Sequence, residues 1–520
     1  MTRNDSRMMG LKSGEEVKEG FFDTKIDTGV GSLLGAVGNL LNERGVQAYL
    51  VGGFVRDALL HRRTADIDIA VASDALAIAR VVAGALGGRF VTLDEENGVA
   101  RIILVGGDVF PGENQWQVDF STFRGSIEED LARRDFTVDA MAVELNQITT
   151  TDRAVRLVDP FGGREDIKSG VIRSVSEAAF ESDAVRLLRA VRLAAELGFS
   201  IDSVTEAQVQ HHAGLIAGVA GERIREELLR LLAVPGSGRF LVYLDSLCLL
   251  TALIPELVAA RGVEQPREHF WDIFEHSLKT VLAVDFLLQE GSWEYGDDVL
   301  LATVPWSSEL AAHFSPEVGS GSTGRSLLKL AALLHDIAKP QTRNIDEDGR
   351  MRFLGHAGEG ASVAAGVLER LRFSNREIKF VEAIVLHHLR PMQMSHGGLP
   401  SRRAVYRYFR DTGDAAMEIL FLSLADHLAT RGPHLEMAGW QEHIDIVKYV
   451  LAQHFEQESR PQPVKLIDGH DLINTFGMSP GIRLGKLLEA VREAHAAGEV
   501  TTRQEALEFV GSHLSTEERG

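Results

Sequence analysis

The sequence has very little cysteine, no long apolar run and fewer basic than acidic residues. Its 520 residues include one cysteine, Cys248, so no disulfide can form within the chain. We expect this thiol to be buried in the apolar segment LVYLDSLCLL, as is typical of a reducing, cytoplasmic setting. No apolar run reaches the roughly 18 residues that a membrane span requires, so we expect no membrane partner. The polar segment at the start lacks the apolar core of a signal peptide, and we interpret it as a mobile tail.

The deficit of positive charge limits the kinds of partner. The chain has 54 basic and 75 acidic residues, a net charge of −21. This argues against nucleic-acid binding driven by bulk charge. A nucleic-acid partner would have to meet local arginine clusters instead.

The pattern of apolar residues predicts an α+β protein, with a small mixed α/β head followed by all-helical domains. Strand-like segments such as DIDIAVA, ARIILVG and QWQVDFSTF occur before residue 150, and helical spacing dominates from about 175. A stretch rich in glycine and serine over 290–325 predicts a loop insertion. We therefore expect a tail over 1–25, the head over 26–150, a helical neck over 151–260, a further helical domain over 261–455 and a C-terminal helical module over 456–520.

The segment LVGGFVRDALLHRRTADIDIAVA contains candidate phosphate and metal ligands. Gly52 and Gly53 follow a predicted strand, where backbone N–H groups can approach a phosphate, and Arg56 can add charge to the same anion. Asp66 and Asp68 lie two apart in a predicted strand, so both carboxylates face one side. Such a pair can hold the divalent metals that phosphoryl transfer needs. A tight turn and a solvated strand edge are the alternatives.

More candidate charges follow on later segments. Asp119, on another predicted strand, is either a third acid of the site or a solvated strand residue. Arg133, Arg134 and Asp135 precede an apolar run, an arrangement that suits a triphosphate clamp or, alternatively, the end of a surface helix.

Four segments, in this order, resemble the class II tRNA nucleotidyltransferase and bacterial poly(A) polymerase family, which includes the CCA-adding enzymes. They are GGFVRD with DIDIA, then RRDFTVDAMA, then DPFGGREDI, then SDAVRLLRAVRLAAELGF, and the similarity as a whole runs from about residue 52 to about residue 230. The resemblance implies template-independent addition of C, C and A to the 3′ end of tRNA from CTP and ATP, in tRNA maturation and repair. An A-adding, CC-adding or poly(A)-forming enzyme is the alternative within the family.

The resemblance also implies roles for the residues singled out above. Asp66 and Asp68 would be the catalytic carboxylates and hold Mg²⁺. Arg133, Arg134 and Asp135 would contact the nucleotide.

The resemblance makes Asp183 and Arg186 the pair that selects the base. We expect them to lie three apart on one helical face. Cytosine and adenine each present an amino donor beside a ring-nitrogen acceptor, which a carboxylate and a guanidinium would match. A surface ion pair is the alternative. Arg189 and Arg192 extend the same stripe and would contact phosphate or ribose, although a solvated helix face explains them equally well.

Two positions depart from the family pattern. Ser182 stands where the family usually has Glu, directly before the selecting Asp183. Asp139 stands where the family often has Asn. The first departure bears on the orientation of the selecting pair. The second adds negative charge near the triphosphate, unless Asp139 binds metal or points away.

A second set of candidate ligands lies in the helical part of the chain. Its members are histidines and aspartates that we expect to converge on a metal: His276, His335, Asp336, His356, His388 and Asp426. The helical spacing of His335 and Asp426 turns both inward, and buried polar groups without partners are costly. Nitrogen and oxygen ligands of this kind suit Mn, Ni, Co, Zn or Fe.

The order of these residues, with the segment HDIAKP, resembles the HD phosphohydrolase domain. The resemblance implies a first metal on His276, His335, Asp336 and Asp426, and places for a second metal at His356 and His388, in preference to the adjacent His387. Metal-bound hydroxide attacking a phosphoester is the implied chemistry. A chain that acts mainly as such a phosphohydrolase, with a head that only binds RNA, is therefore a rival interpretation.

One basic cluster lies near the C-terminal module. Arg402, Arg403, Arg407 and Arg410, interleaved with aromatic residues in SRRAVYRYFR, are candidates for tRNA contact or for a partly solvated helix face. Nothing in the sequence indicates the oligomeric state.

Overall fold

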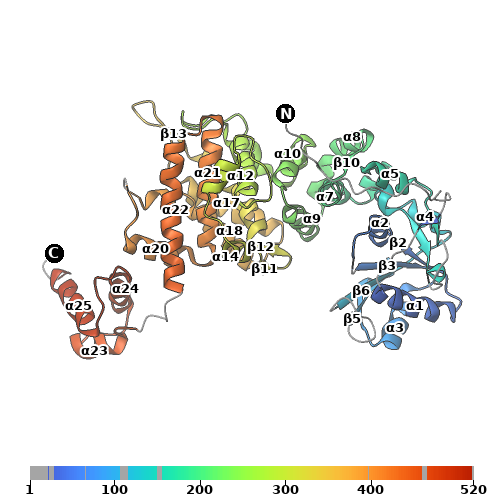
Figure 1. The fold of residues 1–520 in the computed structure, drawn as a ribbon, viewed down its shortest axis with the longest axis horizontal. Coiled ribbons are helices and arrows are strands. Elements are labelled where there is room, and N and C mark those ends of the chain that lie inside the picture. The colour runs from blue at the N-terminus through green and yellow to red at the C-terminus, as the bar shows by residue number, and fades with distance from the viewer. Residues whose placement is uncertain are drawn as a thin grey trace, which may run out of the picture. The chain divides into compact units, whose positions relative to one another are not determined.

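The structure is a computed structural model that describes residues 21–22, 28–64, 66–105, 115–148, 155–395, 398–458 and 465–517. The chain divides into two compact units, Met1–Leu215 and Ile216–Gly520 (Figure 1). The first unit holds a mixed sheet and the second is mainly helical, which confirms the α+β class expected from the sequence. Among these residues no helix combines the length and the apolar character of a membrane span.

An eight-stranded sheet forms the centre of the first unit, in the order β1-β8-β7-β2-β3-β6-β5-β4. Its strands are β1 Phe21–Phe22, β2 Ala48–Val51, β3 Asp66–Val71, β4 Arg89–Asp94, β5 Val99–Val105, β6 Gln115–Thr122, β7 Ala142–Glu144 and β8 Val155–Val158. β3 and β6 run parallel, and the other neighbours in this sheet run antiparallel. Alternate residues of β5 and β6 are buried, as strand periodicity requires, and α3 packs against both strands.

The sheet extends beyond the limits that we expected for the head. β8 lies past residue 150, and Phe21 and Phe22 of the expected tail pair with Arg156 and Val155. The rest of the expected tail, 1–20 and 23–25, lies outside the described residues.

Short helices connect and cover the strands of the first unit. They are α1 Thr28–Asn42, α2 Gly53–Leu59, α3 Ala75–Leu86, α4 Ile127–Leu131, α5 Gly163–Ser169, α6 Ala178–Ser182, α7 Arg186–Leu197 and α8 Ser203–His212, with the 3₁₀ turn η1 Thr137–Asp139. α7 ends at Leu197, and Gly198 follows it in the left-handed conformation at φ 71°, as is common for a glycine after a helix.

The start of that helix differs from our expectation. Asp183 has extended backbone between α6 and α7, and α7 begins only at Arg186. The prediction that Asp183 and Arg186 share one helical face is therefore wrong. The physical reason is local, because the Asp183 carboxylate accepts a hydrogen bond from the Val185 N–H at 3.4 Å, and such a side chain favours a helix start over a helix interior.

The second unit is built from helices. They are α9 Gly221–Ala233, α10 Gly238–Ser246, α11 Leu249–Leu253, α12 Ile273–Leu287, α13 Asp298–Thr303, α14 Ser308–His313, α15 Gly324–Leu334, α16 Lys339–Thr342, α17 His356–Arg370, α18 Asn375–His387, α19 Arg390–Gln393, α20 Arg402–Thr412, α21 Ala416–Arg431, α22 Met437–Glu458, α23 Gly469–Phe476, α24 Ile482–Ala496 and α25 Arg503–Glu517. α12 packs against α15 and α21, and α18 packs against α15 and α17. This buried group of helices holds the second candidate site.

Two expectations for this unit are wrong. The segment 290–325 is not a plain loop, because it contains α13, α14 and the hairpin of β11 (Glu317–Gly319) and β12 (Ser322–Thr323). Cys248 is exposed, because it occupies the turn between α10 and α11 in a left-handed conformation, φ 59°, which removes it from the apolar helix faces.

Candidate active site and metal centre

Three carboxylates gather where β3 and β6 run parallel. Asp66 and Asp68 point to one side of β3, with Asp66 exposed and Asp68 half-buried, and Asp119 of β6 stands directly opposite Asp68 in the register. Burial raises the pKa of Asp68 to about 6, with Arg134 opposing the rise and Asp119 adding to it. Such a concentration of carboxylate oxygens fits a divalent cation.

Arg101 distinguishes the third acid from the other two. Its Nε and Nη2 donate to the two oxygens of Asp119 at 2.7 and 2.8 Å. This bidentate pair already neutralises Asp119. Asp66 and Asp68 therefore stay the candidate ligands for the metal.

The glycine turn lies against this carboxylate group. Gly52 has φ 67° and ψ −140°, a conformation that side chains rarely adopt. A Cβ atom there would lie 2.9 Å from Arg134 Nη1 and 3.2 Å from Asp68 Oδ2. Gly52 is thus required both by its backbone and by the close approach of Arg134 and Asp68. The structure brings together three of the residues that the sequence singled out for phosphate and metal.

Arg56 is less available than the sequence suggested. It is 9% exposed, and its Nη1 lies 2.6 Å from Asp139 Oδ1 while its Nε lies 3.0 Å from Asp57 Oδ1. Asp139 is buried and also lies 3.5 Å from Arg189 Nη2. The unusual charge of Asp139 is therefore neutralised inside the fold rather than directed at a triphosphate, and Arg56 is one of the groups that neutralise it.

The next residues of the nucleotide set lie beside this ion pair. Asp135 is buried, and its Oδ2 lies 2.7 Å from Arg189 Nε. Burial alone would raise the pKa of Asp135, but Arg189 and Arg186 hold it below its usual value. Arg133 is exposed. Arg192 is 2% exposed and paired with Glu196, so its guanidinium is neutralised inside the fold.

Arg186 is held at the base of α7 by three oxygen atoms. Its Nη1 donates to Ala179 O and to Ser182 Oγ, each at 3.2 Å, and its Nη2 donates to Arg133 O at 3.0 Å. Asp183, half-buried, lies on the backbone directly before α7. The two residues expected to select the base thus come from the end of α6 and the start of α7 rather than from one helix.

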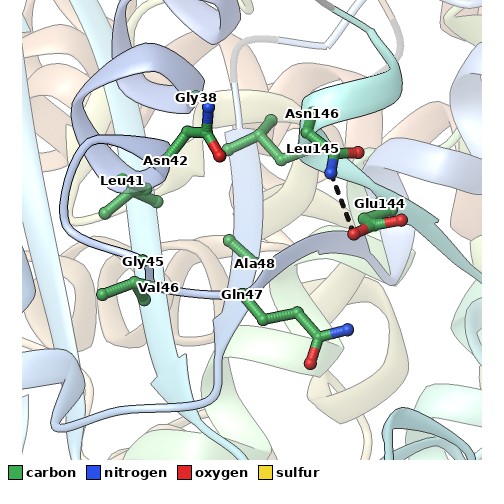
Figure 2. A pocket seen from close by; sticks show the side chains of 10 residues that line it. All are labelled: Gly38, Leu41, Asn42, Gly45, Val46, Gln47, Ala48, Glu144, Leu145 and Asn146. Atoms are coloured by element: carbon green, nitrogen blue, oxygen red, sulfur yellow. Dashed lines mark hydrogen bonds between the residues drawn. The ribbon is translucent and has the colours of Figure 1, made fainter.

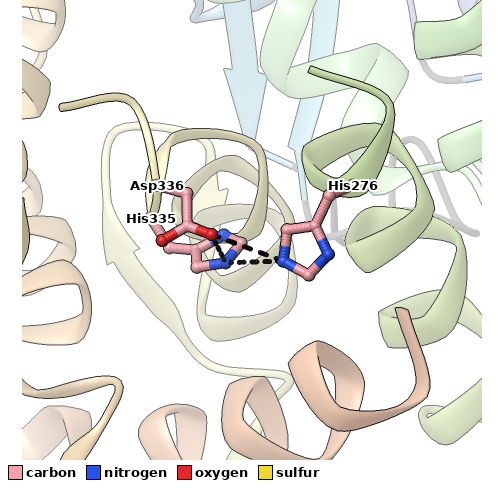
Figure 3. A group of neighbouring side chains, drawn as sticks. All are labelled: His276, His335 and Asp336. Atoms are coloured by element: carbon pink, nitrogen blue, oxygen red, sulfur yellow. Dashed lines mark hydrogen bonds and ion pairs between the residues drawn. The ribbon is translucent and has the colours of Figure 1, made fainter. Parts of the chain in front are cut away.

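Buried imidazoles and carboxylates converge in the second unit. His276 of α12 faces His335 and Asp336, which directly follow α15 (Figure 3). His276 Nε2 lies 3.1 Å from Asp426 Oδ1 and 3.4 Å from Asp336 Oδ2, and His335 Nε2 lies 3.1 Å from Asp336 Oδ2. The ligand atoms of His276, His335 and Asp336 form one possible metal position, and Asp426 lies beside it against His276.

Asp336 connects this group to a second one. Its other oxygen, Oδ1, lies 3.5 Å from His356 Nε2 and 3.9 Å from His388 Nε2. Burial would raise the pKa of Asp336, but His335 and Lys339 hold it well below its usual value. A charged carboxylate with histidine nitrogens on both oxygens is a chemically suitable bridge between two metal ions.

The histidines are oriented for metal binding by the backbone. The Nδ1 atoms of His335, His356 and His388 lie 2.7 to 2.8 Å from the carbonyl oxygens of Ala332, Phe353 and Val385, respectively. A ring that donates from Nδ1 keeps the lone pair of Nε2 for a metal. Burial and the neighbouring His335 lower the pKa of His388 to about 4, which keeps that ring neutral. The structure brings His388, and not His387, into the cluster.

The basic cluster of α20 faces another part of the protein. Arg407 and Arg410 each lie 2.6 Å from oxygens of Glu493 on α24, and Arg403 lies 2.6 Å from Glu499. These contacts were not expected from the sequence. They give the arginines a role in attaching the C-terminal module.

A pocket of about 250 Å³ lies at the C-terminal end of α1, beside β2 (Figure 2). Leu41, Gln47 and Glu144 are among its lining residues, and the Asn146 amide donates to Glu144 at 3.0 Å. The lining contains no residue that the sequence singled out, so the pocket supports no assignment.

Three family models match the sequence. Residues 48–173 match the poly A polymerase head domain, 198–261 match the probable RNA and SrmB-binding site of polymerase A, and 306–431 match the HD domain. The chain is 35% identical over 469 residues to the A-adding tRNA nucleotidyltransferase of Deinococcus radiodurans, covering 89% of this chain and 94% of the relative. It is 33% identical over 471 residues to the CC-adding tRNA nucleotidyltransferase of Thermus thermophilus, covering 89% and 93%.

Solved structures agree in fold. The Thermotoga maritima CCA-adding enzyme complexed with tRNA matches with a TM-score of 0.61 at 23% identity, over 95% of this chain and 100% of that one. A CCA-adding enzyme with ATP matches with a TM-score of 0.63 at 23% identity, over the same shares. The chain belongs to the tRNA nucleotidyltransferase family, whose poly(A) polymerase-type head it joins to an HD domain.

Proposed function

We propose that the protein adds C, C and A, without a template, to the 3′ end of tRNA from CTP and ATP. The observation that carries the proposal is the close approach of Asp68, the Gly52 turn and Arg134, with Asp66 on the same face of β3 as Asp68. This arrangement combines a place for divalent metal with a place for phosphate. Both kinds of domain depend on divalent metals, and Mg²⁺ at Asp66 and Asp68 is our assignment for the head. Bound there, Mg²⁺ would activate the 3′-hydroxyl and stabilise the leaving pyrophosphate.

The other residues of the head bind and select the nucleotide in this proposal. Arg133 and Arg134 hold the triphosphate, Asp183 accepts the amino hydrogen of cytosine or adenine, and Arg186 donates to the ring nitrogen. Guanine and uracil present the reversed donor and acceptor, so both contacts would be left unpaired. Asp135 and Arg189 form an ion pair at this end of the site, and Arg186 lies close enough to lower the pKa of Asp135 as well.

A narrower product is the second candidate. The relatives described above that match over most of their length are named for adding A or for adding CC. The CCA-adding enzyme of Geobacillus stearothermophilus is 35% identical over 257 residues, only 46% of this chain. Addition of A alone, or of CC alone, is therefore the alternative to complete CCA addition.

The HD domain supports a second activity. Asp336 belongs to two groups of possible metal ligands, one with His276 and His335 and the other with His356 and His388. This position supports the binding of one or two transition metals, Mn, Ni, Co, Zn or Fe. We propose metal-dependent hydrolysis of a phosphoester at this site. Bound metal would supply the hydroxide. An enzyme that modifies the 3′ ends of tRNA is expected in the cytoplasm, which supports the location that the sequence predicts.

One assay separates these possibilities. Purified protein is given tRNAs that end before CCA, after C or after CC, together with CTP, ATP or both. Complete CCA addition predicts growth of all three tRNAs to one length when both nucleotides are present. Failure to use CTP would leave an A-adding enzyme, and failure to use ATP would leave a CC-adding one. If neither nucleotide is incorporated while phosphoesters are hydrolysed, the rival phosphohydrolase interpretation replaces the proposal.

A further inference from the structure

Asp426 is the most exposed of the candidate ligands in the metal centre of the HD domain. Its side chain is 23% exposed, and that of His356 is 10% exposed. The remaining side chains are 0 to 1% exposed: His276, His335, Asp336 and His388. A phosphoester that reaches the metal positions therefore approaches them beside Asp426.

The segment before α12 crosses α21 at this opening. Thr430 lies four residues after Asp426, about 6 Å along α21, and its hydroxyl donates to Asp426 Oδ1 at 3.2 Å. The backbone N–H of Phe270 donates to the Thr430 carbonyl at 3.0 Å. The ring of the preceding residue, His269, lies 5.6 Å from the ring of His276. Phe270 is thus held beside the exposed edge of the metal centre by contacts with both α21 and α12.

Phe270 presents an exposed aromatic ring that its neighbours hold in place. It is 45% exposed, although Phe is normally a buried residue. Its ring centroid lies 4.6 Å from that of Trp271 and 5.3 Å from that of His434, both in edge-to-face contact. Gly432, at φ 51°, packs against both residues, because a Cβ there would lie 3.3 Å from Trp271 Nε1 and 3.4 Å from Phe270 Cβ. This packing leaves a fixed apolar surface next to a charged centre.

A nucleobase is the ligand that suits this surface. Base–aromatic stacking contributes about 1–3 kcal/mol per base and tolerates every base, since each has a π face. In a nucleotide one ribose separates the base from the phosphoester. That separation is comparable with the single helical turn between Asp426 and Thr430, to which Phe270 is bonded. A phosphoester at the metal centre thus brings its base to Phe270, whereas a small alkyl phosphate does not reach the ring.

We propose that Phe270 is a specificity-determining residue of the HD domain, whose ring stacks on the base of a nucleoside phosphoester held at the metal centre. The proposal rests on the phosphoester hydrolysis proposed above. In that reaction a water oxygen forms a bond to phosphorus, the bond between phosphorus and the ester oxygen breaks, and the ester oxygen leaves with a proton. Phe270 takes no part in these bond changes and adds binding free energy for substrates that have a base.

The test compares hydrolysis of 3′-AMP with hydrolysis of glycerol 2-phosphate, another phosphomonoester of a secondary alcohol that has no base. The measured quantity is kcat/KM for 3′-AMP divided by kcat/KM for glycerol 2-phosphate, with Mn, Ni, Co, Zn or Fe added in turn. Loss of stacking predicts that Phe270→Ala lowers this ratio about 5- to 100-fold. Phe270→Tyr keeps the ring and should stay within about threefold of the unchanged protein. Phe455→Ala, which removes a 37% exposed ring from α22, should leave the ratio unaltered.

A binding measurement separates stacking from an effect on the metals. The dissociation constant of 3′-AMP is measured by equilibrium dialysis without added metal, in an Arg186→Ala background that weakens binding by the head. Phe270→Ala should raise this constant about 5-fold or more. A short RNA that ends in a 3′-phosphate, hydrolysed beside 3′-AMP, shows whether an RNA end or a free nucleotide is the better source of the nucleoside phosphoester.

An unchanged ratio in Phe270→Ala, equal losses for both phosphoesters, a Tyr variant that behaves like the Ala variant, or equal binding of 3′-AMP with and without the ring would overturn the proposal. The metal content of Phe270→Ala serves as a folding control and should equal that of the unchanged protein. An unchanged protein that hydrolyses neither phosphoester would refute the proposed hydrolysis itself, and the two failures are therefore distinguishable.

Discussion

The buried pair of Arg56 and Asp139 offers a quantitative test of how this head tolerates its unusual acid. Their side chains are 11% and 3% exposed, and Nη1 and Oδ1 lie 2.6 Å apart. Unit charges about 4 Å apart interact by about 4 kcal/mol at an effective dielectric constant of about 20. Asp57 and Arg189 would keep part of the compensation when one partner is removed. We therefore expect a coupling free energy of about 2–4 kcal/mol between Arg56 and Asp139.

A double-mutant cycle measures this coupling. Arg56→Met and Asp139→Asn should each lower the free energy of opening of the head by about 2–4 kcal/mol, because each leaves a buried charge with fewer partners. The double variant should be little less stable than either single variant. Hydrogen exchange of amides in β2, β3 and β7 reports this free energy for the first unit alone. Single effects that simply add, with a coupling below about 0.5 kcal/mol, would refute the reasoning.

Three further predictions concern other parts of the molecule. Gly52→Ala should lower kcat/KM for nucleotide addition about 100-fold or more, because the new Cβ displaces Arg134 and Asp68. Near-normal activity would contradict the close approach of Arg134 and Asp68 to Gly52. Asp336→Ala should reduce the transition-metal content of the purified protein to near zero, as measured by mass spectrometry. Nucleotide addition should persist in this variant. Retained metal would contradict the bridging role of Asp336. Glu493→Gln should speed amide exchange in α24 about fivefold, the effect of about 1 kcal/mol, and unchanged exchange would mean that these ion pairs do not hold the module.

Local patterns predicted much of the head. The strand alternation of DIDIAVA placed Asp66 and Asp68 on one face of β3, and the structure has them there. The end of α7 at Gly198 was also predictable, because a glycine directly after a helical segment is a strong local signal for a helix end in the left-handed conformation. Such features depend on neighbours in the sequence.

Features that depend on distant residues were not predictable. Arg56 and Asp139 are 83 positions apart, so their pairing could not be inferred from either segment. The break at Asp183 was missed because helical spacing continues through it, whereas the Asp183 carboxylate accepts a hydrogen bond from the Val185 N–H and favours a non-helical backbone there. An Asp three residues before a basic helix position was the signal that could have indicated a helix start.

The sequence predicted which residues belong to the metal centre better than it predicted how these residues are arranged. Helical spacing indicated that His335 and Asp426 turn inward, but the sequence alone did not show that Asp336 presents one oxygen to each group of histidines. That arrangement depends on how α12, α15 and α18 pack, which is a property of the whole unit.

The most direct test of the central claim is incorporation of labelled CMP and AMP into tRNA that lacks its 3′ CCA, by the unchanged protein and by Asp66→Ala with Asp68→Ala. The account predicts addition by the unchanged protein and a loss of about 1,000-fold or more in the double variant, since metal binding supplies several kcal/mol to phosphoryl transfer. The metal content of the HD domain should not change. Addition that survives the loss of both carboxylates would contradict the account.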